Sequence, residues 1–313
     1  MDIHINNSFS IIENKKTKAI AEEIMKIIFL VCAFFAVLAV FSITIYMILN
    51  GTPAILKIGL KEILFKTQWA PTAADPKYGI LYVILTSIVG TTFAVLIGVP
   101  IGVLTAVFIA EVAPKQLAAI VKPAVELLAG IPSVIYGLLG IMILNPFMYK
   151  IEKIIFKGSS THQFTGGSNL ISAIIVLAIM ILPTVINISE SSIRAVPREM
   201  RSASLALGAS KIQTIFKVVL PVARSGIMSA IVLGVGRAIG EAMAITLVSG
   251  SSVNLPLPFN SVRFLTTAIV AEMGYAADEH RQVLFTIGLI LFFFIMVVNT
   301  VFAKLLSTNE KEK

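Results

Sequence analysis

The apolar run IIFLVCAFFAVLAVFSITIYMIL, residues 27–49, contains 23 residues and no charged side chain. About 20 consecutive apolar residues are enough for a helix to cross the hydrocarbon core of a bilayer. The run is too long for the apolar core of a secretory signal peptide, and no small-residue cleavage site follows it. We therefore predict a retained membrane anchor.

Similar apolar runs recur along the rest of the chain, so this segment is the first of a series. We predict an all-α integral membrane protein with six transmembrane helices. The predicted spans are 27–49, 79–110, 123–149, 170–190, 226–250 and 283–304.

Composition supports the same class. The 313 residues are 57% hydrophobic and only 13% charged, whereas soluble domains carry about 25% charged residues. The single cysteine, Cys32, excludes a disulfide within the chain, and no Cys/His spacing typical of a metal site occurs. The three histidines, His4, His162 and His280, lie outside the apolar runs, and we expect them to be solvated.

The net charge of +8 is explained by membrane orientation better than by nucleic-acid binding. Cytoplasmic loops of membrane proteins carry an excess of Lys and Arg. With both termini in the cytoplasm, the inside segments hold 15 of these residues and the outside segments nine. We therefore predict cytoplasmic termini and outer loops at 50–78, 150–169 and 251–282.

The cytoplasmic segment between the fourth and fifth spans has the pattern of two short helices. Good helix formers occupy 198–207, Gly208 is a stop signal, and Ser210 can cap a second helix that Pro221 ends. The segment is either a docking site for a partner or an amphipathic linker on the membrane surface. Its second helix has apolar residues at helical spacing: Ile212, Ile215, Phe216 and Val219.

Two charged residues, Arg237 and Glu241, lie within the fifth apolar run. Charges at this depth are costly and mark functional sites by default. Their i, i+4 spacing predicts a pair on one helix face, and Gly236 and Gly240 beside them predict close approach of a neighbouring helix. The guanidinium fork fits the oxygens of an oxyanion, and the carboxylate can accept a hydrogen bond from a protonated phosphate oxygen. The alternative is an ion pair that only joins helices.

The stretch SASLALGASKIQTIFKVVLP, residues 202–221, resembles the EAA loop with which permeases of ABC importers dock on their ATPase. Serine replaces the usual Glu and the second Ala of that motif, and Glu199 and Arg201 are candidates to replace the Glu. We assign the coupling loop to 194–224, with the motif positions Ser202, Ala203, Ser204, Gly208, Leu220 and Pro221.

Two membrane motifs, LLAGIPSVIYGLLG at Leu127–Gly140 and GRAIGEAMAIT at Gly236–Thr246, accompany this loop in the same order as in the PstC family of phosphate ABC-transporter permeases. The chain is similar to that family over most of its length. The resemblance singles out Arg237 and Glu241 as substrate-path residues. It also singles out a third-span motif of Gly130, Pro132, Ser133, Tyr136 and Gly137.

The resemblance implies a type I ABC-importer permease in the cytoplasmic (inner) membrane of a prokaryote. A cytoplasmic segment, 1–26, would precede a permease domain, 27–306, and a cytoplasmic tail, 307–313. The expected partners are a PstA-like permease, two PstB-like ATPase subunits and an extracytoplasmic phosphate-binding protein.

No P-loop occurs in the chain, so ATP and Mg²⁺ are expected on the ATPase, and no cofactor or nucleic acid is expected on this subunit. Two other functions stay open. One is a permease for molybdate, tungstate or sulfate, and the other is a self-sufficient secondary transporter that uses Arg237 and Glu241 as a proton relay.

Overall fold

The computed structural model describes residues 3–311, with side chains for 18, 21–301 and 304. The chain divides into two compact units, 1–50 and 51–313. The first unit is the N-terminal part of one helix, α1 (Ile3–Ile58), whose apolar side chains are exposed. The helix contains a candidate span at Ala21–Ile58. A lipid-facing anchor requires such an apolar, exposed helix.

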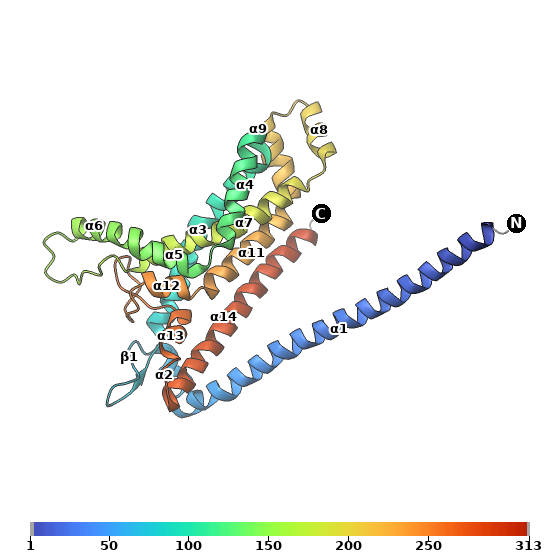
Figure 1. The fold of residues 1–313 in the computed structure, drawn as a ribbon. Coiled ribbons are helices and arrows are strands. Elements are labelled where there is room, and N and C mark those ends of the chain that lie inside the picture. The colour runs from blue at the N-terminus through green and yellow to red at the C-terminus, as the bar shows by residue number, and fades with distance from the viewer. Residues whose placement is uncertain (1–2, 312–313) are drawn as a thin grey trace. The chain divides into compact units, whose positions relative to one another are not determined.

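The centre of the second unit is a set of three helices that lie side by side in Figure 1: α3 (Leu81–Val107), α7 (Leu170–Arg194) and α11 (Arg224–Gly240). Small residues let α3 and α7 approach closely. A Cβ atom on Gly98 would lie 2.6 Å from Cδ1 of Ile181, so a larger residue there would require the Ile181 side chain to shift. Residues such as Ile181 and Leu177 are fully buried in this core.

The C-terminal helix α14 (Asp278–Lys311) packs on α11 and on the short helix α13 (Leu265–Glu272). Five of the helices in the described residues are long and apolar enough to span a membrane. A sixth is counted if the two segments Lys211–Val222 and Arg224–Gly240, bent by 69°, form one span. The six-span architecture and the helical fold class agree with the sequence prediction.

The predicted span 123–149 is divided between separate helices. Pro132 lacks an N–H group and disfavours the helical conformation at Ile131, whose ψ of 126° is extended. A helix therefore ends at Gly130 and another begins at Ser133. The segments are α4 (Lys115–Gly130), α5 (Ser133–Leu139), the π-helical turn η2 (Gly140–Leu144) and α6 (Asn145–Ile155).

The one β-sheet in the described residues is a small hairpin next to α2 (Leu60–Phe65). Its strands are β1 (Trp69–Ala70) and β2 (Lys77–Tyr78), paired antiparallel with Trp69 opposite Tyr78. In Figure 1 the hairpin lies at one end of the second unit. We call this the hairpin end.

Buried carboxylates hold two sets of loops, one at the hairpin end and one after α6. The Glu272 carboxylate accepts hydrogen bonds from Trp69 Nε1, at 3.0 Å, and from Arg263, and it is 2.7 Å from His280 Nε2. Glu152 is fully buried, accepts a hydrogen bond from Thr165 N at 2.9 Å and is 2.9 Å from His162 Nε2.

The expectation that the histidines are solvated is therefore wrong for His280 and His162. Their rings are mostly buried because each binds a buried carboxylate, and composition could not reveal those partners. The His4 side chain lies outside the described side chains.

Candidate functional site

The continuous helix predicted over 226–250 is interrupted at Glu241. The residue is extended, with φ −72° and ψ 129°, so α11 ends at Gly240. A second helix, α12 (Met243–Val248), begins beyond the break, and Glu241 Oε1 accepts a hydrogen bond from Ala244 N at 2.9 Å in its first turn. Glu241 thus caps α12, and the predicted helix face shared with Arg237 does not exist.

Arg237 finds another partner. Its Nη1 donates to Oγ1 of Thr184, on α7, at 3.3 Å. Within the described residues it forms no ion pair with Glu241 and no further hydrogen bond. A guanidinium has five N–H donors, so most of those on this half-buried side chain are available to a ligand. Thr184 was missed because a threonine inside an apolar run gives no sign of which helix it faces.

The close helix approach expected at Gly236 and Gly240 is also not made within the described residues. A Cβ atom at either position would meet no heavy atom within 4 Å, whereas one at Gly234 would lie 2.9 Å from Val185 Cγ2. The face of α11 that contacts α7 is therefore offset from the predicted one.

The third-span motif builds a second break beside the first. Pro132 precedes α5, and Ser133 is its first residue. The Tyr136 hydroxyl donates to the carbonyl oxygen of Leu128 at 2.8 Å, which ties α5 back to the last turn of α4.

Gly137 sets the distance between α5 and α12. A Cβ atom on Gly137 would lie 2.8 Å from Cα of Ala244, so the two backbones touch. Gly130 behaves differently, since its Cβ would meet nothing within 4 Å. Both interrupted spans therefore meet through α5 and α12, and Arg237 lies one turn before the break at Glu241.

The segment that resembles a coupling loop forms the opposite end of this unit in Figure 1. Gly208, with φ +85°, separates α8 (Arg198–Ala206) from α9 (Lys211–Thr214). The predicted cap is confirmed: Ser210 and Gln213 form a reciprocal capping box.

Pro221 does not end the second helix as predicted. α9 continues through a π-helical turn, η3 (Ile215–Val219), and α10 (Leu220–Val222), and the chain bends at Ala223 into α11. Proline is tolerated in the first turn of a helical segment, which is where α10 places it.

The apolar side chains of this end divide into two sets. Ile215 and Val219 are buried against the ends of the spans. Four others point away from the chain and form an exposed set that we call the α8–α9 patch: Leu205, Leu207, Ile212 and Phe216.

The serines of the motif have different surroundings. Ser204 Oγ lies 2.9 Å from Thr214 Oγ1 and joins α8 to α9, whereas Ser202 and Ala203 are exposed. Arg201 is bound within the chain, to Glu111 among others, whereas Glu199 is exposed.

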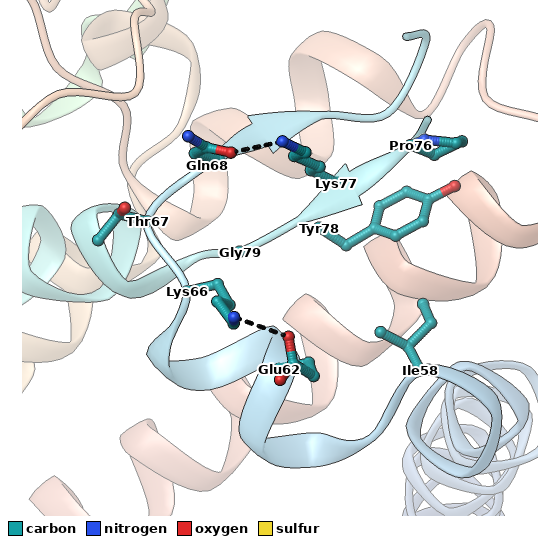
Figure 2. Close-up of a pocket in the computed structure, with 9 residues that line it drawn as sticks. All are labelled: Ile58, Glu62, Lys66, Thr67, Gln68, Pro76, Lys77, Tyr78 and Gly79. Atoms are coloured by element: carbon teal, nitrogen blue, oxygen red, sulfur yellow. Dashed lines mark hydrogen bonds and ion pairs between the residues drawn. The ribbon is translucent and has the colours of Figure 1, made fainter. Parts of the chain in front are cut away.

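A hollow of about 600 Å³ lies at the hairpin end, between α2 and β2. Figure 2 shows Lys66 directed at Glu62 and Lys77 directed at Gln68, so its polar side chains bind one another. Burial raises the pKa of the Tyr78 phenol, and the Glu279 charge adds to the effect, so this hydroxyl is neutral at pH 7. Arg237 is not among the residues that line this hollow. Among the described residues there is no group of three or more side chains that could hold a metal ion.

Comparison with known proteins identifies the fold and the family. The family described as "Binding-protein-dependent transport system inner membrane component" matches residues 98–309. The chain belongs to this family. It is therefore a membrane-spanning permease component of an ABC importer.

Individual relatives narrow the assignment. The permease is 37% identical over 297 residues to the probable ABC transporter permease protein YqgH of Bacillus subtilis (strain 168), covering 92% of this chain and 93% of that protein. It is 33% identical over 303 residues to the phosphate transport system permease protein PstC of Xylella fastidiosa (strain 9a5c), covering 93% of each. The resemblance to PstC is thus confirmed.

A solved structure of the MetNI methionine ABC transporter, in an inward facing conformation, agrees in fold. It matches with a TM-score of 0.52 and 20% identity over 74% of this chain and 94% of that one.

We predict that Gly137→Ala destabilises the permease and that Gly130→Ala does not. The added methyl of the first variant must push α5 and α12 apart, and such overpacking costs about 1–3 kcal/mol. The second adds a methyl in open space. Thermal unfolding of each purified variant in detergent measures the difference, and equal midpoints for the two would contradict this account of the motif.

Proposed function

We propose that this permease forms half of the translocation path of an ATP-driven importer of inorganic phosphate. The observation that carries the proposal is its similarity, over nearly the whole chain, to permeases named for phosphate transport. The chemistry of the interrupted fifth span is compatible with a phosphate substrate, because Arg237 offers a permanent positive charge and available N–H donors.

We assign the recognition of phosphate to Arg237 and Glu241. The guanidinium fork would bind two phosphate oxygens at once. One oxygen of Glu241 is used by Ala244 N, and the other has no hydrogen bond within the described residues. That second oxygen would accept the proton of hydrogen phosphate, a donor that sulfate lacks at neutral pH.

The energy would come from a separate ATPase that docks on the coupling loop. The α8–α9 patch supports this step, since its four exposed apolar side chains offer a surface that a protein partner can cover. We also propose a PstA-like second permease, two PstB-like ATPase subunits and an extracytoplasmic phosphate-binding protein.

Two alternatives remain in competition with this proposal. A permease for molybdate, tungstate or sulfate would use the same fold with another selectivity. A secondary transporter would need no ATPase and would use Arg237 and Glu241 as a proton relay. Because these two side chains bind different partners and form no ion pair in the described residues, the structure gives that relay little support.

The first prediction is that the permease takes up phosphate only within its complex. Proteoliposomes with the complete complex should accumulate radiolabelled phosphate when ATP is supplied to the ATPase side, and those with the permease alone should not. Robust uptake by the permease alone would overturn the ABC importer and favour the secondary transporter. Uptake of molybdate or sulfate in preference to phosphate would favour another oxyanion.

The second prediction concerns Arg237→Lys. Lysine keeps the charge but loses the planar pair of donors, so phosphate uptake should fall about tenfold, the equivalent of one charge-assisted hydrogen bond of about 1.5 kcal/mol. Arg224→Lys, at the exposed start of the same helix, is the matched control. Near-normal uptake by Arg237→Lys, at matched membrane abundance, would mean that Arg237 is structural.

The third prediction is the orientation. We propose cytoplasmic termini, from the 15-to-nine distribution of Lys and Arg. A reporter fused after residue 313 and another inserted in 251–282 should be detected on opposite sides of the membrane. Detection of both on one side would contradict the six-span arrangement.

A further inference from the structure

Arg201 makes an unusual set of contacts for a residue on a surface helix. Its Nε and Nη2 both donate to Oε1 of Glu111, at 3.1 and 2.9 Å. Nη2 also donates to the carbonyl oxygen of Ile193 at 2.7 Å, and Nη1 donates to that of Val196. The Arg201 and Glu111 side chains are only 21% and 13% exposed, so solvent screens the pair less than it would a surface pair.

Two of the acceptors belong to different spans. Glu111 lies in the π-helical turn η1 (Phe108–Val112) at the end of α3, and Ile193 is in the last turn of α7. A single guanidinium therefore joins α8 to the ends of two of the three helices at the centre of the fold.

Little else holds α8 in place. None of its residues is buried, and Met200 and Leu205 are exposed. Besides Arg201, the one side-chain hydrogen bond recorded for α8 in the described residues is that between Ser204 and Thr214 of the next helix. Apolar packing thus cannot fix α8 against the spans, and the polar contacts of Arg201 must do so.

A second charged group reinforces the same turn. The buried Glu190 carboxylate binds Lys122 Nζ at 3.1 Å and the side chain of Arg194. Arg194 also donates to the carbonyl oxygen of Ile109, in η1, at 3.3 Å. Because η1 is held to α7 through Arg194, a force applied to Glu111 acts on α3 and α7 together.

We propose that Arg201 is the positioning residue that transmits movement of α8 to the membrane spans. The inference rests on the proposed function, in which α8 docks on an ATPase. Movement of the ATPase then displaces α8, and the bonds of Arg201 to Glu111 and to the carbonyl oxygen of Ile193 carry the displacement into α3 and α7. Arginine suits this role because it holds three acceptors in fixed directions, which a lysine ammonium on a flexible stem does not.

The test measures phosphate transported per ATP hydrolysed by the complete complex in proteoliposomes. The variants are Arg201→Gln, Glu111→Gln and the double variant. Lys115→Gln is the matched control, because Lys115 is an exposed basic residue close in sequence to Glu111, outside the coupling loop, with no ion pair in the described part of the chain. Co-purification of the ATPase with each variant checks that the complex assembles.

Arg201→Gln should lower the ratio at least about fivefold while ATP hydrolysis stays within about twofold of wild type. Glu111→Gln should lower it less, since the two carbonyl acceptors remain. The double variant should be no worse than Arg201→Gln, because both changes remove one interaction. A variant that only unfolded the permease would lose hydrolysis and transport together.

An unchanged ratio in Arg201→Gln, an equal loss in Lys115→Gln, or additive losses in the double variant would overturn the inference. These outcomes differ from a failure of the proposed function. If the wild-type complex takes up no phosphate with ATP, the proposed function and this inference fail together; if wild type transports and Arg201→Gln does so equally well, this inference alone fails.

Discussion

Backbone polar groups in a hydrocarbon environment must be hydrogen-bonded within the protein, since each one left unpaired costs several kcal/mol. A helix satisfies its own backbone, but an interrupted helix does not, and this permease interrupts two spans. At the second break Glu241 accepts from Ala244 N, and Thr266 Oγ1 donates to the carbonyl oxygen of Glu241 at 2.7 Å. At the first, the Tyr136 hydroxyl reaches the carbonyl of Leu128. The breaks are thus completed by side chains and held together by the contact of Gly137 with Ala244.

The ends of the spans use a different device. Buried carboxylates help to organise the loops and short helices there. Glu272 does this at the hairpin end, Glu152 for the loop that follows α6, and Glu190 near the coupling loop. Removing one partner of a buried ion pair costs about 3–5 kcal/mol, so such groups fix the geometry of the segments they join. The coupling helix α8 is fixed in this way through Arg201 and Glu111.

The coupling loop shows how a departure from a family motif can be accommodated. Ser204, in place of the second alanine, lies against Thr214 and joins the two helices of the loop. Ser202, in place of the usual Glu, is exposed and has no such contact in the described residues. Shape and apolar surface, through Gly208 and the α8–α9 patch, are therefore the features of the loop that remain for a partner.

The sequence by itself determined the membrane class, the six apolar spans and the capped turn at Ser210, because apolar length, proline and capping residues act over a few neighbouring positions. Pro132 even marks the first break, although the predicted span ran across it. The tertiary structure alone decided which groups meet. Arg237 bonds to Thr184 rather than to Glu241, His280 binds Glu272, and Arg201 binds Glu111. These partners are 53, 8 and 90 residues apart. Helical spacing predicts neighbours on one unbroken helix; where the helix breaks or the partner is on another element, packing of the spans decides the contact.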